Sequence, residues 1–258
     1  MIKFPKLIVH FSYHKCMTAF YENVFSHFCN ATNIRYKHHN NNLDLFYKSI
    51  KNRTKPSILS VNNKNPDFDN IPNYLGSHFI RDPRDLLVSG YRYHKWCKEP
   101  WANQPMSQEL KNILNLEDLG IEVGNESYQQ ILLNTDEITG YKIEFRWRKN
   151  GLNQMKKWDY DNPLILEMKY EYIFGNEVEE FSKLYNHYEL PPENYPFFKN
   201  CIEKFNFESL KKNNKTGSKK HAEIGVPQQW KNIMPVEAYN MFMDEYENLI
   251  EVLNYEMH

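Results

Sequence analysis

A short apolar segment near the N-terminus, followed by a polar turn and an amphipathic helix, constrains the fold of this chain most strongly. Residues 6–11 read Lys-Leu-Ile-Val-His-Phe, a β-branched apolar run typical of a strand buried in a parallel sheet. After the turn, Phe20, Val24 and Phe28 recur every four residues, on one face of a helix that Thr18 can cap. A strand joined to a helix in this way is a building unit of α/β folds.

The alternation of strand and helix continues along the chain. Further apolar segments with the length of strands lie at residues 57–61, 77–80 and 163–168. Helical periodicity predicts helices over residues 83–96, 107–116, 126–149, 177–187, 200–212 and 236–255. This order predicts a three-layer α/β fold, with a mostly parallel central sheet flanked by helices.

The organisation of the chain indicates one domain over residues 1–258. Its 258 residues, 41% of them apolar, can form a sizeable core, and neither an internal repeat nor a linker divides them. The mixed, Pro-containing pattern around residues 98–125 predicts a lid or insertion. The polar, basic segment around residues 211–222 predicts a mobile surface loop.

Charge and cysteine content exclude several classes of protein. The 32 Lys and Arg residues nearly balance 33 Asp and Glu, so the formal charge of −1 gives no global attraction for nucleic acid. The four cysteines are far apart in sequence, which indicates reduced thiols rather than a zinc site or a disulfide framework. Without a long apolar run or a signal-peptide pattern, we expect a cytoplasmic protein without a membrane partner.

The turn after the first predicted strand is a candidate anion site. Residues 12–18 read Ser-Tyr-His-Lys-Cys-Met-Thr and end where a helix begins. Backbone N–H groups, the positive end of the helix dipole and the charge of Lys15 together favour a phosphate or sulfate. The loop lacks the glycines of a Walker A motif, and a plain surface lysine before a helix is the alternative.

Two later segments carry related chemistry. Residues 79–94 read Phe-Ile-Arg-Asp-Pro-Arg-Asp-Leu-Leu-Val-Ser-Gly-Tyr-Arg-Tyr-His, with Asp82 suited to cap a helix. Arg81 and Ser89 could hold one phosphate together, because Arg offers a planar fork of donors and Ser a hydroxyl. Residues 223–232 read Glu-Ile-Gly-Val-Pro-Gln-Gln-Trp-Lys-Asn, a Gly-Pro loop that leads to a tryptophan.

In this order, the segments resemble the sulfotransferase family that uses 3′-phosphoadenosine 5′-phosphosulfate (PAPS). Residues 80–91 are similar to its 3′-phosphate motif, and residues 15–20 resemble its 5′-phosphosulfate loop, usually Lys-Ser-Gly-Thr-Thr-Trp. Residues 225–231 resemble its Gly-x-x-Gly-Asp-Trp-Lys segment, and residues 169–171 its Tyr-Glu-Asp turn. The resemblance spans nearly the whole chain and implies a P-loop-like phosphosulfate-binding loop.

The resemblance also implies an activity and its residues. A sulfuryl group would pass from PAPS to a hydroxyl or amine of a small-molecule acceptor by in-line displacement, leaving PAP and using no metal. Lys15 would neutralise the bridging oxygen as the sulfuryl group leaves, and Arg81 with Ser89 would bind the 3′-phosphate. Phe20 would stack on adenine, unless it only belongs to the apolar face of its helix. The implied nucleotide contacts are Lys15, Cys16, Met17, Thr18, Ala19, Phe20, Arg81, Ser89, Tyr170 and Gly225.

Several positions depart from the family pattern, among them Cys16 in place of the loop serine. Glu223 stands where the family usually has an Arg, and a basic residue among positions 219–221 could supply the missing charge. Met17 replaces a loop glycine, so a left-handed backbone would be strained there. Gln228 replaces the second glycine of the C-terminal segment.

The general base is not at its family position. Cytosolic members carry it as a His after the strand that precedes the Arg motif, whereas residues 60–63 here read Ser-Val-Asn-Asn. His94 is our first candidate, followed by His14 and then by His38 and His39.

The acceptor pocket and two alternative functions complete the expectations. Tyr93, His94 and Trp96 are predicted to contact the acceptor, although packing under the lid would also account for the aromatic rings. A non-catalytic nucleotide-binding or scaffold descendant of the fold would explain Glu223 and the missing base. A small-molecule kinase is a further alternative, but Cys16 stands where a kinase needs a metal-binding Ser or Thr.

Overall fold

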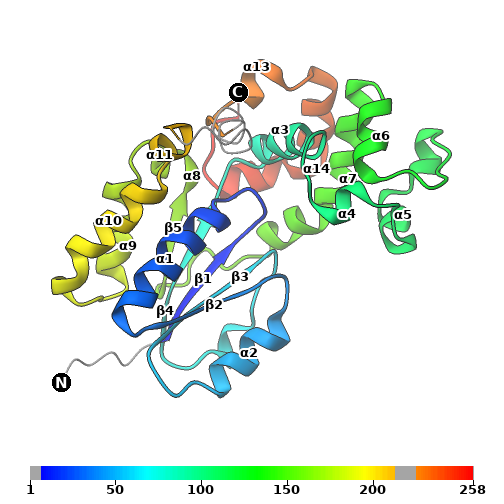
Figure 1. Cartoon of the computed structure of the whole chain (residues 1–258). Coiled ribbons are helices and arrows are strands. Elements are labelled where there is room, and N and C mark those ends of the chain that lie inside the picture. Colours follow the sequence, from blue (N-terminus) through cyan, green and yellow to red (C-terminus); the bar gives the residue numbers. More distant parts are fainter. Residues whose placement is uncertain (1–6, 213–224, 258) are drawn as a thin grey trace. The chain divides into compact units, whose positions relative to one another are not determined.

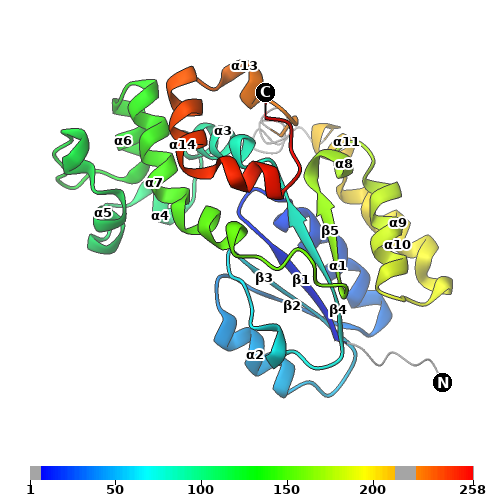
Figure 2. The same cartoon turned by 180° about the vertical axis from the view of Figure 1, so that it is seen from behind.

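The computed structural model describes residues 7–212 and 225–257. Its strands are β1 (Leu7–Ser12), β2 (Arg35–His39), β3 (Ser57–Asn62), β4 (Tyr74–Ile80) and β5 (Ile165–Lys169). They form one parallel sheet in the order β2-β3-β1-β4-β5 (Figures 1 and 2). The predicted α/β fold with a parallel central sheet is confirmed.

The described residues divide into two compact units: unit 1 contains residues 7–81 and 157–212, and unit 2 contains residues 82–156 and 225–257. Compact units occur both within one domain and as separate domains, so the single domain stays a prediction. In unit 1 the helices are α1 (Thr18–Thr32), α2 (Leu43–Lys51), η1 (Phe68–Asn70), α8 (Tyr170–Ile173), α9 (Glu177–His187), η3 (Pro192–Asn194), α10 (Tyr195–Phe205) and α11 (Phe207–Lys212). In unit 2 they are α3 (Pro83–His94), α4 (Pro100–Asn103), α5 (Gln108–Leu114), η2 (Leu116–Leu119), α6 (Tyr128–Asn134), α7 (Glu137–Lys156), α13 (Trp230–Ile233) and α14 (Val236–Val252).

Unit 1 has three layers because both faces of its sheet are covered. On one face, His10 of β1 stacks on Tyr21 of α1, with ring centroids 3.5 Å apart. On the other face, Phe11 of β1 contacts Phe46 of α2 at 5.8 Å and Trp158 at 5.3 Å. Figure 1 accordingly shows α1, α9 and α10 on one side of the sheet and α2 on the other. Alternate residues of a buried strand therefore meet different helical layers.

Strand register aligns the carboxyl ends of the central strands. Ser12 of β1 pairs with Phe79 of β4, and Ile80 of β4 pairs with Lys169 of β5. The segments that follow these strands therefore leave the sheet on the same side, at the carboxyl ends of the strands, where ligands bind in open α/β sheets.

The segment predicted as a lid or insertion is packed into unit 2. Leu110 and Leu114 of α5 and Leu116 of η2 are buried in one apolar cluster with Tyr91 of α3 and Tyr141 of α7. Residues 213–222 of the predicted mobile loop lie outside the described residues, while residues 211 and 212 end α11.

Three helical predictions need correction. Met17, not Thr18, is the N-cap of α1, and no side chain caps that helix. The helix predicted over residues 126–149 is two helices, because Asp136 starts a new one by accepting a hydrogen bond from the Thr139 N–H at 3.0 Å. The helix predicted over residues 200–212 is divided at Asn206 into α10 and α11.

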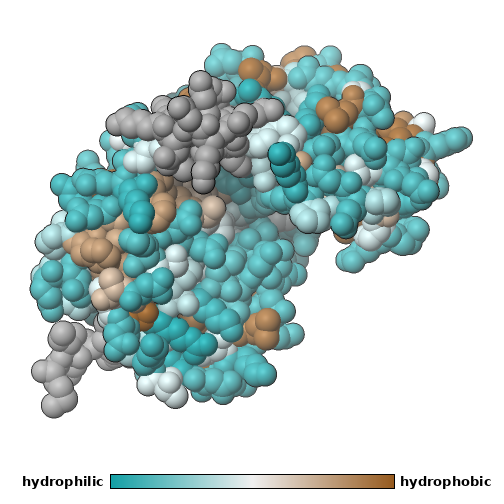
Figure 3. Space-filling model, in the orientation of Figure 1, coloured by the Kyte–Doolittle hydropathy of each residue, from teal (hydrophilic) through white to brown (hydrophobic). Residues whose placement is uncertain are grey.

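The surface drawn in Figure 3 is mostly hydrophilic, with apolar residues in separate spots. Single exposed apolar side chains of this kind are ordinary on a protein surface. Among residues 7–212 and 225–257, no helix combines the length and apolar character needed to cross a membrane.

Candidate functional site

The loop between β1 and α1 has two left-handed residues that are not glycine. The φ angle is 69° at Lys15 and 58° at Met17. Within the loop, the Cys16 N–H donates to the Tyr13 carbonyl at 3.0 Å. From outside it, the Asn63 side chain accepts a hydrogen bond from the His14 N–H at 2.7 Å. The loop therefore keeps a glycine-type conformation, with its strain opposed by hydrogen bonds.

The side chains of this loop differ in exposure. Cys16 and Met17 are buried, whereas Lys15 and Thr18 are partly exposed and Ala19 is exposed. The hydroxyls of Ser12 and Thr18 form a hydrogen bond at 2.8 Å.

Phe20, the residue predicted to stack on adenine, is 9% exposed. Its ring contacts Phe181 of α9 edge-on at 5.0 Å. It therefore belongs to the apolar face of α1, and a second role in stacking on a base stays a prediction.

Arg81 and Tyr170 lie at the same sheet edge, because each directly follows one of two paired strands. The Arg81 guanidinium carbon is 4.2 Å from the centroid of the Tyr170 ring. Both side chains are buried. The cation–π contact orients the guanidinium, which is a ready partner for a phosphate.

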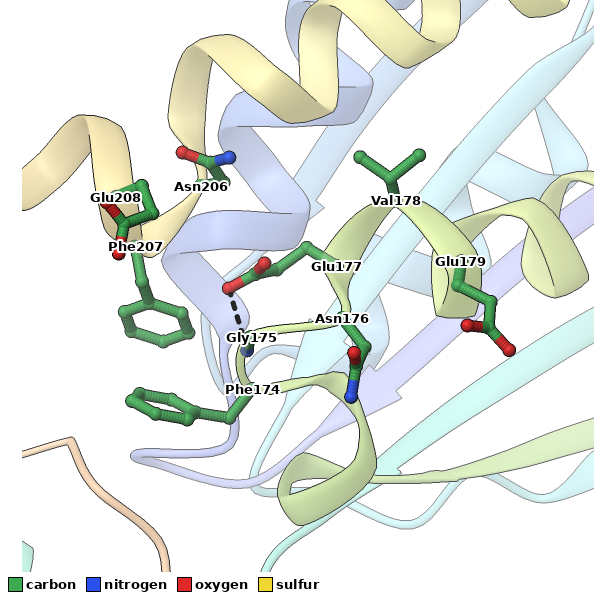
Figure 4. Close-up of a pocket in the computed structure, with 9 residues that line it drawn as sticks. All are labelled: Phe174, Gly175, Asn176, Glu177, Val178, Glu179, Asn206, Phe207 and Glu208. Carbon is green, nitrogen blue, oxygen red and sulfur yellow. Dashed lines mark hydrogen bonds between the residues drawn. The ribbon is translucent and has the colours of Figure 1, made fainter.

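A pocket of about 460 Å³ adjoins this pair in unit 1. Figure 4 shows the rings of Phe174 and Phe207 facing one another at its edge, and their centroids are 4.6 Å apart. The Tyr170 ring lies 5.8 Å from Phe174 and 6.2 Å from Phe207. The lining residues are Phe174, Gly175, Asn176, Glu177, Val178, Glu179, Asn206, Phe207 and Glu208. Tyr170 was predicted from the sequence but this pocket was not, because its one local signal is Phe174, four residues after Tyr170, while Phe207 is far away in the sequence.

The N-terminus of α3 holds the C-terminal loop of unit 2. Asp82 caps α3 by accepting a hydrogen bond from the Arg84 N–H at 2.9 Å, as predicted. The buried carboxylate of Asp85 accepts hydrogen bonds from the backbone N–H groups of Gln228 at 2.6 Å and Trp230 at 3.0 Å. Gln228, which stands where the sequence resemblance would place a glycine, has a φ of 60°. As at Met17, the glycine-type conformation is kept without glycine.

Ser89 and Gly225 also belong to unit 2, and both are buried. The structure therefore brings the Lys15 loop, Arg81 and Tyr170 together in unit 1. In unit 2, Ser89 lies in α3, and Gly225 lies in the segment that leads to the loop held by Asp85.

His94 belongs to a buried polar cluster in unit 2. Its Nδ1 lies 2.8 Å from Glu144 Oε2, to which the Tyr128 hydroxyl also donates at 2.7 Å. Arg148 Nε donates to Glu144 Oε1 at 2.7 Å. Burial alone would raise the pKa of Glu144, but the charges of His94 and Arg148 lower it to about 2. This bonding supports the fold, and the role of His94 as a base stays a prediction.

The other predicted residues have these surroundings. Tyr93 and Trp96 are half-buried, with ring centroids 5.2 Å apart, and the Tyr93 hydroxyl donates to Glu99. His38 Nδ1 lies 2.9 Å from the Ser60 hydroxyl, and His39 is buried at the end of β2.

Comparisons with known proteins support the fold. No protein-family model matches the chain, and no curated protein matches its sequence. Among solved structures, mouse sulfotransferase SULT7A1 complexed with PAP is similar, with 16% identity, a TM-score of 0.51, and 95% of this chain and 84% of that chain covered. Retinol dehydratase in complex with androsterone and inactive cofactor PAP has 12% identity and a TM-score of 0.49, over 98% and 82% of the two chains. The first likeness shows that this chain has the α/β fold of a sulfotransferase.

Proposed function

We propose that the chain is a PAPS-dependent sulfotransferase acting on a hydroxyl or amine of a small-molecule acceptor. The observation that carries the proposal is the alignment of three strand ends in unit 1. The Lys15 loop, Arg81 and Tyr170 directly follow β1, β4 and β5, which are neighbours in one sheet. A nucleotide with phosphates at both ends of its ribose needs cationic groups in such an arrangement. The sulfotransferase fold and the PAP bound to SULT7A1 support this interpretation.

Each part of the nucleotide has a complementary group. In this proposal, Lys15, Thr18 and the loop backbone bind the 5′-phosphosulfate. Arg81, oriented by Tyr170, binds the 3′-phosphate, and Ser89 and Gly225 keep the 3′-phosphate roles that the sequence resemblance implies.

The adenine ring occupies the pocket beside Phe174 and Phe207. Aromatic rings offer a stacking surface to a base. The described lining of this pocket contains glutamates but neither lysine nor arginine, so it favours an uncharged ring over a phosphate.

The proposed reaction needs positioning and charge stabilisation more than covalent help from the protein. The acceptor oxygen or nitrogen attacks sulfur in line with the bond to the 5′-phosphate oxygen, and that bond breaks. The Lys15 ammonium neutralises the charge on the departing oxygen, and a base takes the acceptor proton. His94 stays the first candidate base, with Glu144 orienting its ring, although its Nε2 is buried in this structure.

Nucleotide binding gives the first test. At 100 times its Kd, PAP should stabilise the wild type by about 2.7 kcal/mol in a thermal-shift titration. Lys15→Ala and Arg81→Ala should each reduce that shift. The matched control is Lys55→Ala, because Lys55 is exposed and precedes β3, at the opposite edge of the sheet from Lys15. Stabilisation by ATP-Mg but not by PAP would indicate a kinase instead.

Transfer of labelled sulfate from PAPS to a panel of hydroxyl and amine acceptors gives the second test. We expect transfer by the wild type and none by Lys15→Ala. PAP binding without transfer to any acceptor would favour the non-catalytic alternative, for which the absence of His from residues 60–63 is the motivating observation.

A further inference from the structure

A buried carboxylate lies in the wall of the pocket beside Phe174 and Phe207. Glu177 is the first residue of α9, and the residue as a whole is only 6% exposed. Its Oε1 accepts a hydrogen bond from the Gly175 N–H at 3.2 Å, drawn as a dashed line in Figure 4. Gly175 has a φ of 82°, which glycine adopts without strain and which turns the chain between α8 and α9. The short turn therefore fixes the position of this carboxylate.

The second oxygen of Glu177 is available to a ligand. Within residues 7–212 and 225–257, Gly175 is its one hydrogen-bond partner, and no cationic side chain forms an ion pair with it. Figure 4 shows the Glu177 side chain extending toward the side of the pocket where Phe174 and Phe207 lie, whereas Glu179 extends away from them. A carboxylate that is mostly buried is stabilised when a donor meets its remaining oxygen. The pocket thus has an apolar aromatic surface and one well-placed, negatively charged acceptor.

We propose that Glu177 selects the base of the nucleotide by accepting a hydrogen bond from the exocyclic amino group of adenine. This inference rests on the proposed function, which puts the base in this pocket. The aromatic pair contacts the ring, and Oε2 of Glu177 meets a polar group on its edge. Hydrogen bonds to a charged acceptor are stronger than those between neutral groups, so this contact contributes to selectivity as well as affinity.

The charge of Glu177 sets the direction of the selectivity. Adenine carries an amino group, a donor, where hypoxanthine carries a carbonyl oxygen, an acceptor. A carbonyl oxygen at that position would be repelled by the carboxylate, and the neighbouring N1–H of hypoxanthine would reach Glu177 only if the base shifted in the pocket. Sites that hydrogen-bond a particular ligand group reject analogues that lack it. We expect the adenine nucleotide to bind about 10-fold to 100-fold more tightly than its hypoxanthine analogue.

The test is a comparison of Kd values for PAP and inosine 3′,5′-bisphosphate by isothermal titration calorimetry. In Glu177→Gln, the amide oxygen can still accept from Gly175 while the amide N–H₂ faces the pocket, so a donor replaces the acceptor. We expect the preference for adenine to fall about tenfold or to invert. Glu179→Gln is the matched control, since it removes the same charge from a side chain that is 75% exposed. It should keep the wild-type ratio.

A second variant keeps the test decisive if Glu177→Gln does not fold. Glu177→Asp keeps the charge but shortens the side chain by one methylene, so it cannot reach both Gly175 and the base. It should lower the ratio without inverting it. Equal affinities of the wild type for the two nucleotides, or an unchanged ratio in both Glu177 variants, would overturn the role of Glu177 and leave the proposed function standing. Failure of the wild type to bind either nucleotide would remove the proposed function itself.

Discussion

Gly90 in α3 allows a sharp test of the buried cluster around Glu144. A Cβ at position 90 would overlap Glu144 Oε1 and lie 2.7 Å from Arg148 Nη2. Neither atom can withdraw freely, because Glu144 is fully buried and bonded to His94, Tyr128 and Arg148. We therefore expect Gly90→Ala to push the carboxylate out of its hydrogen bonds.

The magnitude follows from two opposing effects. Alanine favours a helix interior over glycine by about 1 kcal/mol. Separating a buried ion pair costs about 3–5 kcal/mol, because one charge is left without its partner. We therefore expect Gly90→Ala to lower the free energy of unfolding by about 2–4 kcal/mol. Gly151→Ala in α7 is the matched control, since among the described residues nothing beyond its chain neighbours and its own helix backbone lies within 4 Å of the added Cβ. It should raise that free energy by about 0.5–1 kcal/mol.

The assay is urea unfolding followed by circular dichroism, with the midpoint and slope compared for the wild type and both variants. The two substitutions are chemically identical and both lie in helices of unit 2, so propensity alone predicts the same sign for both. A Gly90→Ala protein as stable as Gly151→Ala would refute the closely packed cluster.

Three further predictions concern pH, backbone strain and catalysis. Burial, together with the charges of His78 and His38, holds the pKa of His10 well below its usual value of 6.5. The neutral ring therefore contributes fully to the free energy of unfolding above pH 6.5, and this contribution is lost as the pH falls from 6.5 toward the lowered pKa. His10→Asn should flatten the fall in unfolding free energy on the acid side. Gln228 is exposed and has a φ of 60°, so Gln228→Gly should stabilise the folded protein by about 0.5–1 kcal/mol. Gln229, with a φ of −60°, is the control: Gln229→Gly should destabilise the folded protein, and thermal melts of both variants would show the difference. If His94 is the base, His94→Gln should lower kcat by about 10²–10⁴ and flatten its pH profile while PAP affinity is kept; an unchanged kcat would exclude it.

Buried strands of the sheet could be predicted from the sequence, whereas a partly exposed strand could not. The strands found at Leu7–Ser12 and Ser57–Asn62 begin within one residue of their predicted starts, because buried strands need continuous apolar runs. The strand Arg35–His39 was missed, since it is an edge strand of polar residues, most of them half-buried. Edge strands avoid apolar runs, so hydrophobic patterning does not detect them.

The candidate site divides in a similar way. The positions of the Lys15 loop, Arg81 and Tyr170 at strand ends could be predicted, because local order along the chain is enough to find a segment that follows a strand. Their roles as nucleotide contacts stay predictions. The pocket at Phe174 and Phe207 could not, because residues from two different helical regions meet there only after packing. An aromatic residue near a helix is also typical of an ordinary core.

Met17 and Gln228 are left-handed residues that stand where the sequence resemblance would place glycines, and each is supported by an acceptor outside its loop. Asn63 accepts from His14 near Met17, and Asp85 accepts from Gln228 itself. A left-handed conformation costs a residue other than glycine about 1–2 kcal/mol. The hydrogen bonds to Asn63 and Asp85 therefore offset a strain that glycine at these positions would not have. Asn63 also lies in residues 60–63, the segment in which the resemblance would place a His as base, and its side chain is used there to hold the loop. Asn63→His should therefore loosen the loop, seen as faster amide hydrogen exchange at residues 13–17, before it could supply a base. Unchanged exchange there would contradict the anchoring role of Asn63.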